Sequence, residues 1–303
     1  MQYFCFAFCR MAFLGYGILS QMNGKGMFMN RRSFLQAGAA ALCGMALQGT
    51  AETPVARRIK TGVQLWSVKA LCEKDFIGTL KALKQMGYAG VQCGGFFNHT
   101  ASELKTIFAD NGLAPAGMQM QAEKIVKPEN LAASVAFAHE LGTPYLFVPF
   151  FDAKTPDGWK RFGEQMATAA TAFKAAGIRL GYHNHQHEFR DTFDGVCKWE
   201  FLFKNTSPDV CQQLDIGHCT LAGADPVYWL NKYPGRIPAV HAKTASKSSG
   251  AVGGPTDAVK WDAVFPACET AGTEWYVVEA EVHQDALDDV RSSLQFFKSK
   301  GRA

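Results

Sequence analysis

The sequence predicts a single α/β domain of the (β/α)8 TIM-barrel class, and two observations carry this prediction. The first is a repeated unit, in which an amphipathic stretch ends in glycine and a short β-rich run begins at once. Glycine just past a helix supplies a left-handed cap, and the runs that follow have the length and composition of strands. The second is that five such units and three further strand candidates between them make eight strands. Strict alternation of strands and helices implies parallel strands joined by helical crossovers.

The predicted elements can be given in chain order. The strands are 61–67 (TGVQLWS), 88–93 (YAGVQC), 113–120 (LAPAGMQM), 143–151 (TPYLFVPFF), 178–185 (IRLGYHNH), 209–217 (DVCQQLDIG), 237–244 (IPAVHAKT) and 273–281 (TEWYVVEAE). The clearest amphipathic helices are 75–86, 101–111, 129–141 and 158–176. A doubly wound sheet is the alternative, but the first strand is not followed by the glycine-rich turn that binds phosphate in such folds.

Domain limits follow from these elements. The barrel is predicted over residues 60–303, close to the size of about 250 residues that is typical of this fold. The Ser/Gly-rich stretch 242–258 is predicted to be a loop after the seventh strand, so no boundary divides the barrel.

Residues 1–51 are predicted to be an N-terminal extension with a twin-arginine-type signal peptide. Residues 30–51 (NRRSFLQAGAAALCGMALQGTA) combine paired arginines, an apolar stretch and small residues at a cleavage site. An amphipathic or disordered leader is the alternative. The apolar stretch is too short for a stable span. We therefore expect export to the periplasm, with no stable membrane insertion after cleavage.

Charge and cysteine content narrow the class of partner. The net charge is +4, and the segment 1–51 contributes four basic residues and no acidic one, so removing it leaves 27 basic against 27 acidic residues. A neutral protein has no electrostatic footprint for nucleic acid. Six of the nine cysteines remain after cleavage, none in a C-x-x-C pair, and we expect them to be buried thiols.

Polar side chains gather at the ends of the last four predicted strands. These are His183 and His185, Asp215 and His218, His241 and Lys243, and Glu279 and Glu281, whereas Trp66, Gln92, Gln119, Phe150 and Phe151 end the earlier strands. In a TIM barrel the carboxyl ends of the strands carry the chemistry. Strand alternation places His183 and His185 on one face, and likewise His241 with Lys243 and Glu279 with Glu281. One histidine, one aspartate, a second histidine and one glutamate are therefore expected at one barrel mouth.

Such a group predicts a site for a divalent metal ion. Mixed imidazole and carboxylate ligands suit Mn²⁺, Zn²⁺, Co²⁺ or Fe²⁺ better than Ca²⁺. We favour Mn²⁺ and leave Zn²⁺, Co²⁺, Fe²⁺ and Mg²⁺ open. Each residue also has a structural alternative: a strand histidine can be a hydrogen-bonded core residue, Glu279 a buried salt-bridge partner, and Asp215 a helix cap. His187 and Glu188 are expected in a loop, with His187 exposed to solvent.

Five motifs resemble one known family. GVQLWS, GYHNHQHEF, QLDIGHC, VHAKT and WYVVEAE occur in the order and at the separations found in the xylose isomerase-like TIM barrels, over roughly residues 60–300. That superfamily contains sugar phosphate isomerases and epimerases, inosose dehydratases and an apurinic endonuclease branch. The resemblance implies that Asp215, His241 and Glu279 bind a divalent metal ion and that His218 contacts substrate. His183 stands where many relatives carry a metal-binding glutamate, and Thr244 where they often carry aspartate.

The resemblance implies a metal-dependent sugar isomerase or epimerase that acts on a free or keto-sugar through an enediolate. The alternative is a lyase or hydratase that eliminates from a 3-keto-glycoside or dehydrates a keto-polyol, because His183 removes one of the two glutamates that epimerases use. A non-catalytic carbohydrate-binding barrel is a third hypothesis, and a homo-oligomer is left open. Glu279 is the first candidate for proton transfer, followed by His185, Glu188 and Lys243. Trp66, His218 and Lys243 are expected to contact a small carbohydrate.

Overall fold

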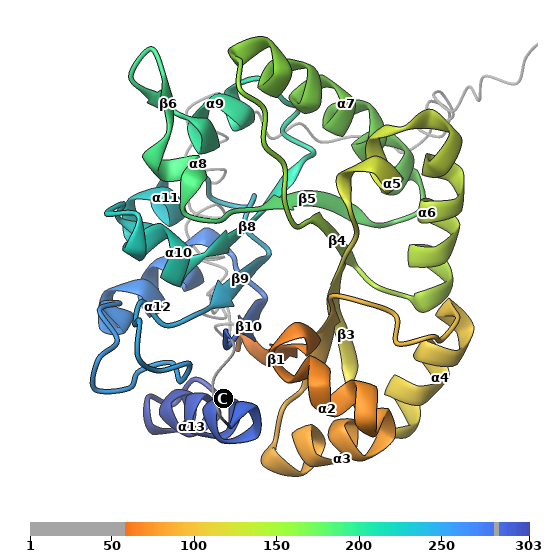
Figure 1. Ribbon diagram of the computed structural model, residues 1–303, viewed down its shortest axis with the longest axis vertical. Helices are drawn as coiled ribbons and strands as arrows, with labels where there is room; N and C mark the ends of the chain where they lie inside the picture. The colour runs from red at the N-terminus through yellow and green to blue at the C-terminus, as the bar shows by residue number, and fades with distance from the viewer. Residues whose placement is uncertain (1–57, 282–284) are drawn as a thin grey trace, which may run out of the picture. The chain divides into compact units, whose positions relative to one another are not determined.

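The structure, a computed structural model, describes residues 58–281 and 285–303. The predicted signal peptide lies outside these residues. Eight parallel strands close into a barrel in the order β1-β10-β9-β8-β5-β4-β3-β2, with helices around the outside (Figure 1). The prediction of a single TIM barrel is confirmed.

The strands are short and each is followed by a crossover on the outside of the barrel. They are β1 (Lys60–Gln64), β2 (Gly90–Cys93), β3 (Ala114–Gln119), β4 (Tyr145–Val148), β5 (Arg179–His183), β8 (Cys211–Asp215), β9 (Ala239–Ala242) and β10 (Trp275–Val278). The short strands β6 (Thr192–Phe193) and β7 (Val196–Cys197) form an antiparallel hairpin between β5 and β8, which the sequence analysis did not predict.

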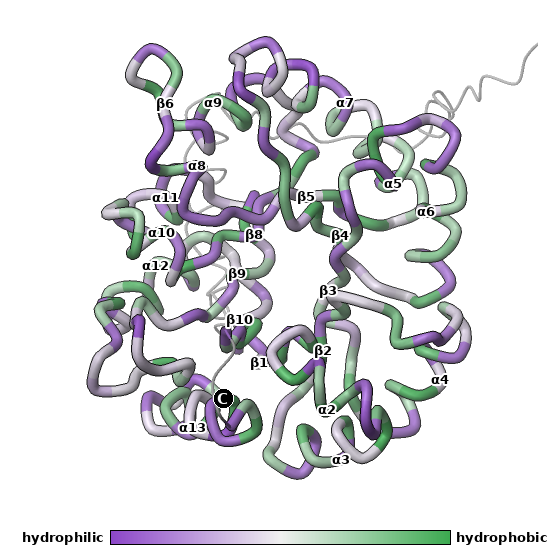
Figure 2. The backbone as a smooth tube through the Cα atoms, in the orientation of Figure 1, coloured by the Kyte–Doolittle hydropathy of each residue, from purple (hydrophilic) through white to green (hydrophobic). Residues whose placement is uncertain are grey.

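The helices are amphipathic, and Figure 2 shows hydrophilic and hydrophobic residues alternating along the outer ring. They are η1 (Leu65–Val68), α2 (Lys69–Lys74), α3 (Phe76–Met86), α4 (Ala101–Asp110), α5 (Ala122–Val126), α6 (Pro128–Leu141), α7 (Pro156–Ala175), α8 (His187–Arg190), α9 (Lys198–Lys204), α10 (Ile216–Leu221), α11 (Pro226–Lys232), α12 (Trp261–Ala271) and α13 (Ala286–Ser299).

Local sequence explains where the predicted helices begin and end. Thr100 starts α4 with a capping box, in which its side chain accepts from the N–H of Glu103 and the Glu103 carboxylate accepts from the N–H of Thr100. Gly87 after α3 and Gly142 after α6 adopt φ of +112° and +76°, which glycine accepts without steric penalty. The glycine-capped repeat in the sequence is therefore real.

The barrel interior has an apolar floor and a polar upper layer. The floor consists of Ala116, Tyr145, Phe147, Cys211, Ala239, Trp275 and Val277. Above it lie the side chains of Gln64, Gln92, Gln119 and Gln213, linked in part by hydrogen bonds between Gln64 and Gln92 and between Gln119 and Gln213. An amide layer thus separates the apolar floor from the mouth.

Several predicted strands extend further than the structure allows. β1 ends at Gln64 and the chain turns into η1, so Trp66 belongs to a 3-10 helix. β5 ends at His183, β4 at Val148 and β10 at Val278, so His185, Phe150 and Glu279 lie in the loops just beyond them.

Two predictions about composition can also be compared with the structure. Among the described residues the six cysteines are free, with five buried and Cys197 partly buried, as expected. Within residues 58–281 and 285–303, no helix has both the length and the apolar character to cross a membrane.

Candidate active site

Four side chains from the last four barrel strands converge below the mouth. His183, Asp215, His241 and Glu279 are buried, and each offers one ligand atom, all within 4.8 Å of one another. His183 and Asp215 are the last residues of β5 and β8, His241 lies within β9, and Glu279 directly follows β10. Asp215 is paired with His241 in the register of β8 and β9, which brings these two side chains together. The group could hold one metal ion.

The hydrogen bonding of this group fits a cation. Among the described residues, His183 Nδ1 and Asp215 Oδ2 are buried without a hydrogen-bond partner. Buried polar atoms are rarely left unpaired, and an unpaired imidazole nitrogen and an unpaired carboxylate oxygen on two residues of this group suit a metal ion. The other Asp215 oxygen, Oδ1, accepts from the N–H of His218 at 2.7 Å and caps α10. The alternative of Asp215 as a helix cap therefore holds for one oxygen and leaves the other available.

The amide layer orients His241. Its Nε2 lies 2.5 Å from Gln92 Oε1, which also accepts from Gln64 Nε2 at 3.0 Å. Because an amide oxygen only accepts, Nε2 carries a proton and Nδ1 faces the carboxylates, 2.9 Å from Glu279 Oε2. A partner that fixes the tautomer in this way is typical of metal-binding histidines. The sequence analysis noted Gln92 only as a strand end.

Asn184 joins the two strands that supply His183 and Asp215. Its Oδ1 accepts from the N–H of Asp215 at 2.8 Å, and its Nδ2 donates to the Asp215 carbonyl at 3.3 Å. The side chain is fully buried. It holds the ends of β5 and β8 in register.

A buried lysine controls the charge of two glutamates. Lys243 Nζ lies 2.6 Å from Glu281 Oε1 and 3.5 Å from Glu279 Oε2. Burial would raise the pKa of Glu279, but Lys243 and His241 hold it well below its usual value. A hydrogen bond from His218, together with Lys243, lowers the pKa of Glu281 to about 2. Lys243 thus lies behind these carboxylates and keeps them ionised.

Two further histidines face the same space. Burial, together with the neighbouring His218, lowers the pKa of His185 to about 4, so the ring is neutral at neutral pH. Burial would lower the pKa of His218 as well, but Asp215 and Glu281 raise it above its usual value. The site therefore offers one imidazole that stays neutral and can accept a hydrogen bond, and a second imidazole, His218, that is protonated more readily.

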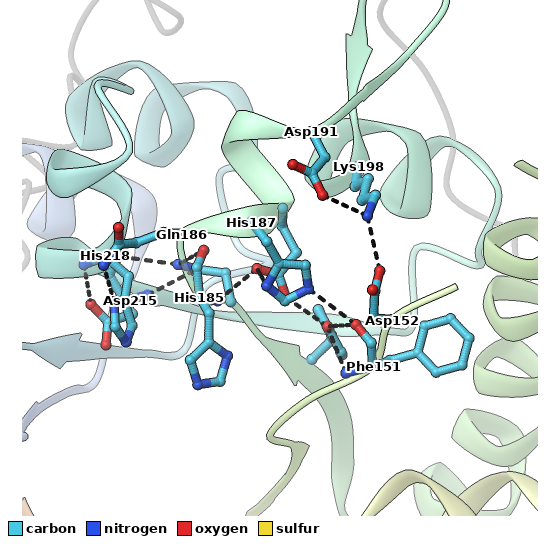
Figure 3. Close-up of polar contacts among 12 residues, drawn as sticks. Phe151, Asp152, His185, Gln186, His187, Asp191, Lys198, Asp215 and His218 are labelled. Atoms are coloured by element: carbon cyan, nitrogen blue, oxygen red, sulfur yellow. Dashed lines mark hydrogen bonds and ion pairs between the residues drawn. The ribbon is translucent and has the colours of Figure 1, made fainter. Parts of the chain in front are cut away.

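Glu188 is not part of this group, contrary to the sequence-based expectation. Its Oε1 accepts from the Tyr182 hydroxyl at 2.7 Å and its Oε2 from the N–H of His185 at 2.8 Å, and the carboxylate is fully buried. Figure 3 shows the His185 ring pointing away from these contacts. We therefore assign Glu188 no proton-transfer role, because its oxygens are directed at the loop and not at the cavity.

His187 is only partly exposed, less than expected from the sequence. Its side chain is 24% exposed, and Nε2 lies 3.2 Å from the Phe151 carbonyl oxygen (Figure 3). It begins α8, in the loop after β5. His187 therefore packs the loop after β5 against the loop after β4.

A cavity of about 490 Å³ opens above the four grouped side chains. Its lining consists of Trp66, Gly94, Gly95, Phe96, Gln119, Met120, Gln121, Lys124, Pro149, Phe150, His183, His185, His218, Glu279 and Glu281. Of the predicted substrate contacts, Trp66 and His218 are in this lining, whereas Lys243 lies behind it. At one edge, the N–H of Ala280 donates to Ser67 Oγ at 2.9 Å and joins the loops after β10 and β1.

Fold and side chains together define a parallel barrel with a candidate metal centre at its carboxyl end. The chain belongs to the xylose isomerase-like TIM barrel family, whose model matches residues 80–300.

Comparison with individual proteins gives more distant similarities. An inosose dehydratase from Geobacillus thermodenitrificans (strain NG80-2) is 27% identical over 250 residues, covering 69% of this chain and 83% of that protein. A solved sugar phosphate isomerase/epimerase from Parabacteroides distasonis ATCC 8503 has a TM-score of 0.71 at 22% identity, covering 80% of this chain and 96% of its own. The IolI protein, solved with a zinc atom bound, has a TM-score of 0.61 at 13% identity, with coverage of 80% and 97%.

Proposed function

We propose that this chain is a divalent-metal-dependent enzyme that removes a proton next to the carbonyl of a keto-sugar or keto-polyol. The observation that carries the proposal is the convergence of His183, Asp215, His241 and Glu279 at the base of one cavity. The names of its relatives, an inosose dehydratase and a sugar phosphate isomerase/epimerase, support an enzyme that acts on small carbohydrates.

The donor set supports a divalent ion, with Mn²⁺ as our first choice and Zn²⁺, the ion in the solved IolI protein, as the nearest alternative. When bound, the ion would polarise the substrate carbonyl and make the neighbouring C–H more acidic. The same four side chains would hold it.

The protein residues divide the proton transfers between them. Glu279 is the base, because Lys243 and His241 keep its carboxylate ionised beside the cavity. His218 is held by Glu281, whose Oε1 lies 3.4 Å from its Nε2, and it is the donor to a substrate oxygen. His185 is a neutral imidazole on the opposite strand end, able to accept a hydrogen bond from a substrate hydroxyl.

Elimination or hydration fits these groups better than isomerisation. Epimerisation needs two equivalent bases on opposite faces of the substrate, and His183 stands where a second glutamate would be. A carboxylate base combined with an imidazole donor suits loss of an oxygen substituent after proton removal. We therefore place a lyase or hydratase first and an isomerase or epimerase second, which reverses the order drawn from the sequence alone.

The test is NMR of the metal-loaded enzyme in D₂O with a panel of keto-sugars, keto-polyols and 3-keto-glycosides. A lyase releases the leaving group from at least one substrate, and a chelated sample does not. Deuterium incorporation without elimination would support the isomerase. A panel without exchange or reaction would contradict the proposal as a whole.

The His183→Glu variant separates the two reaction types further. It restores a second carboxylate on β5, so we expect a larger share of turnovers to return a deuteron to carbon without losing the leaving group. An unchanged ratio of exchange to elimination would contradict the argument that His183 disfavours epimerisation. His139→Glu, on α6 and away from the cavity, is the matched control.

We also propose that the chain is exported by the twin-arginine route, on the basis of the segment 30–51. Replacement of Arg31 and Arg32 by lysine should retain the protein in the cytoplasm. Cell fractionation measures the outcome, and export of the double variant would contradict the route.

A further inference from the structure

Aromatic side chains are exposed at one side of the cavity. In the described part of the chain, the large hydrophobic residues that are exposed are Trp66, Ile77, Phe150 and Tyr228. Trp66 and Phe150 are each 50% exposed, and both line the cavity. Single exposed apolar residues are common on protein surfaces, but two large rings at one cavity indicate a binding surface.

Both rings have defined contacts in the fold. The backbone N–H of Trp66 donates to Gln64 Oε1 and holds the main chain, and Lys69 Nζ lies 4.5 Å from the centroid of the Trp66 ring. Phe150 packs edge-on against His185 with ring centroids 5.6 Å apart, and against His187 at 5.2 Å. The wall is therefore formed before any ligand arrives, which lowers the entropy lost on binding.

A third ring continues the wall between these two. Phe96 lines the cavity and packs against Phe137 of α6 with centroids 4.5 Å apart. Gly94 and Gly95 precede it, and a Cβ atom added at Gly95 would meet no atom within 4 Å. Open space thus lies beside the aromatic wall, on the side of the cavity formed by the loops after β1 to β4.

The cavity is larger than the reacting unit requires. Its volume of about 490 Å³ is in the range of about 300–1,000 Å³ that encloses drug-sized ligands, which are larger than one hexose. A sugar ring that reaches Glu279 and His185 would occupy the polar side, with Phe150 at its edge, and would leave the space beside Trp66, Gly95 and Phe96 empty. Among the lining residues described on that side, Lys124 is the only charged one, so the side suits an uncharged group.

We propose that the natural substrate is a glycoside with a planar, uncharged ring as its aglycone, and that this ring lies against Trp66, Phe96 and Phe150. The chemical basis is the stacking of flat apolar surfaces on aromatic rings. The inference rests on the proposed function for the position of the reacting sugar, and it goes beyond that function by naming the substrate class.

The first test compares the methyl and phenyl glycosides of one keto-sugar, which differ only in the aglycone. Binding is measured by calorimetry on the metal-loaded protein, and turnover by NMR. We expect the phenyl glycoside to bind about 10-fold more tightly and to have the higher kcat/KM, the size of effect that one to two ring contacts give. Equal affinities would overturn the inference.

Three variants then locate the ring. In Trp66→Ala and Phe150→Ala the ratio of phenyl to methyl affinity should fall about 5-fold or more, because a stacking surface is lost. Gly95→Leu should lower the same ratio by filling the open space. Tyr228→Ala, which removes an exposed ring on α11, is the control and should leave the ratio as in the wild type. If the ratio of phenyl to methyl affinity is unchanged in all three variants, the aromatic side is not the aglycone site.

The calorimetric result also separates this inference from the proposed function. If no substrate in the panel reacts but the phenyl glycoside still binds more tightly through Trp66, the aglycone site stands and the proposed chemistry fails. If the free keto-sugar reacts as well as both glycosides, the chemistry stands and the aglycone site fails.

Discussion

The two halves of the barrel mouth are built for different tasks. The loops after β1 to β4, which we call the aromatic half, present Trp66 and Phe150, which are 50% exposed. The ends of β5, β8, β9 and β10 form the polar half, where His183, Asp215 and His241 are at most 2% exposed and the Glu279 side chain is 12% exposed. The sheet order joins the halves at two places, β1 beside β10 and β4 beside β5. Side chains that would hold an ion are buried and fixed by hydrogen bonds, and side chains that would contact a variable group remain open to solvent.

The difference between the halves is also a difference in how each is supported. Glu279 is kept ionised by the neighbouring Lys243, and one oxygen of Asp215 is buried without a hydrogen-bond partner. Trp66 is supported by a hydrogen bond from its main chain and a cation–π contact with Lys69, and Phe150 by ring contacts with His185 and His187. Changes in the first set should therefore affect chemistry and ion binding, and changes in the second should affect substrate choice.

The largest effect is expected from Glu279→Gln. It keeps the size of the side chain and removes the base, so turnover should fall by about 10²–10⁴-fold, the usual contribution of a positioned proton-transfer group. NMR turnover measures it, with circular dichroism to show that the fold is retained. Glu129→Gln, exposed on α6, is the matched control. Activity of Glu279→Gln within about 10-fold of wild type would show that the polar half does not carry the base.

His183→Ala tests the other end of the polar half. Losing one donor from the group should weaken metal binding by more than the roughly 10- to 100-fold that loss of an outer partner causes. Trp66→Ala should leave metal affinity as in the wild type. Calorimetric titration with Mn²⁺ and Zn²⁺ measures the metal affinity of both variants. A similar loss of affinity in His183→Ala and Trp66→Ala would contradict the proposal that the two halves have different functions.

Gln92→Leu examines a residue that crosses the division. Gln92 belongs to β2, in the aromatic half, but it holds His241 in the polar half. We expect metal affinity to fall by about 10- to 100-fold, because His241 loses the partner that fixes its tautomer. Gln85→Leu, exposed on α3, is the control. Unchanged affinity would mean that β9 alone orients His241.

The smallest effect is expected where β4 and β5 meet. Lys198 Nζ donates to Asp152 Oδ1 at 2.9 Å and to Asp191 Oδ2 at 2.8 Å, and so joins the loop that carries Phe150 to the segment after α8 (Figure 3). Lys198→Met should lower the free energy of unfolding by about 1–2 kcal/mol at neutral pH. Lys204→Met, on the exposed face of α9, is the comparison variant.

The pH dependence of this effect has a defined sign. Burial alone would raise the pKa of Asp152, but Lys198 holds it below its usual value of 3.8. A lowered pKa in the folded state stabilises the protein above pH 3.8 and loses that effect as the pH falls further. The difference in stability between wild type and Lys198→Met should therefore shrink below pH 3.8 in urea unfolding experiments. If the difference in stability stays constant with pH, the stabilisation by Lys198 comes from packing of its apolar stem and not from its ion pairs.

The sequence predicted the barrel and the convergence of the four ligand-type residues for physical reasons. Gly87, Gly142 and Gly272 mark helix ends because a left-handed cap needs glycine, and they therefore located the strands that follow. Parallel strands in a barrel end on the same side, so His183, Asp215, His241 and Glu279 had to be close. For this reason the sequence was enough to predict that the ligand-type residues of the last four strands form one site.

What the sequence did not predict depends on side-chain direction within buried strands and loops. Gln64 and Gln92 lie in strands that are buried on both faces, so no alternation of polar and apolar residues shows which face they occupy. Glu188 follows His187 in a histidine-rich stretch, but the short helix α8 directs its carboxylate to Tyr182. Such orientations follow from tertiary contacts and not from the local pattern.

The hydrogen bond between Ser67 and Ala280 has a consequence for how this barrel can diversify. Ser67 follows Trp66, and Ala280 follows Glu279, so this hydrogen bond couples the segment that carries the Trp66 side chain to the segment that carries the proposed base. An insertion after β1 would displace both at once and disturb catalysis. We therefore expect relatives with different substrate preferences to vary near Gly95, where a larger residue fits without moving the base, and to keep the length of the loop after β1.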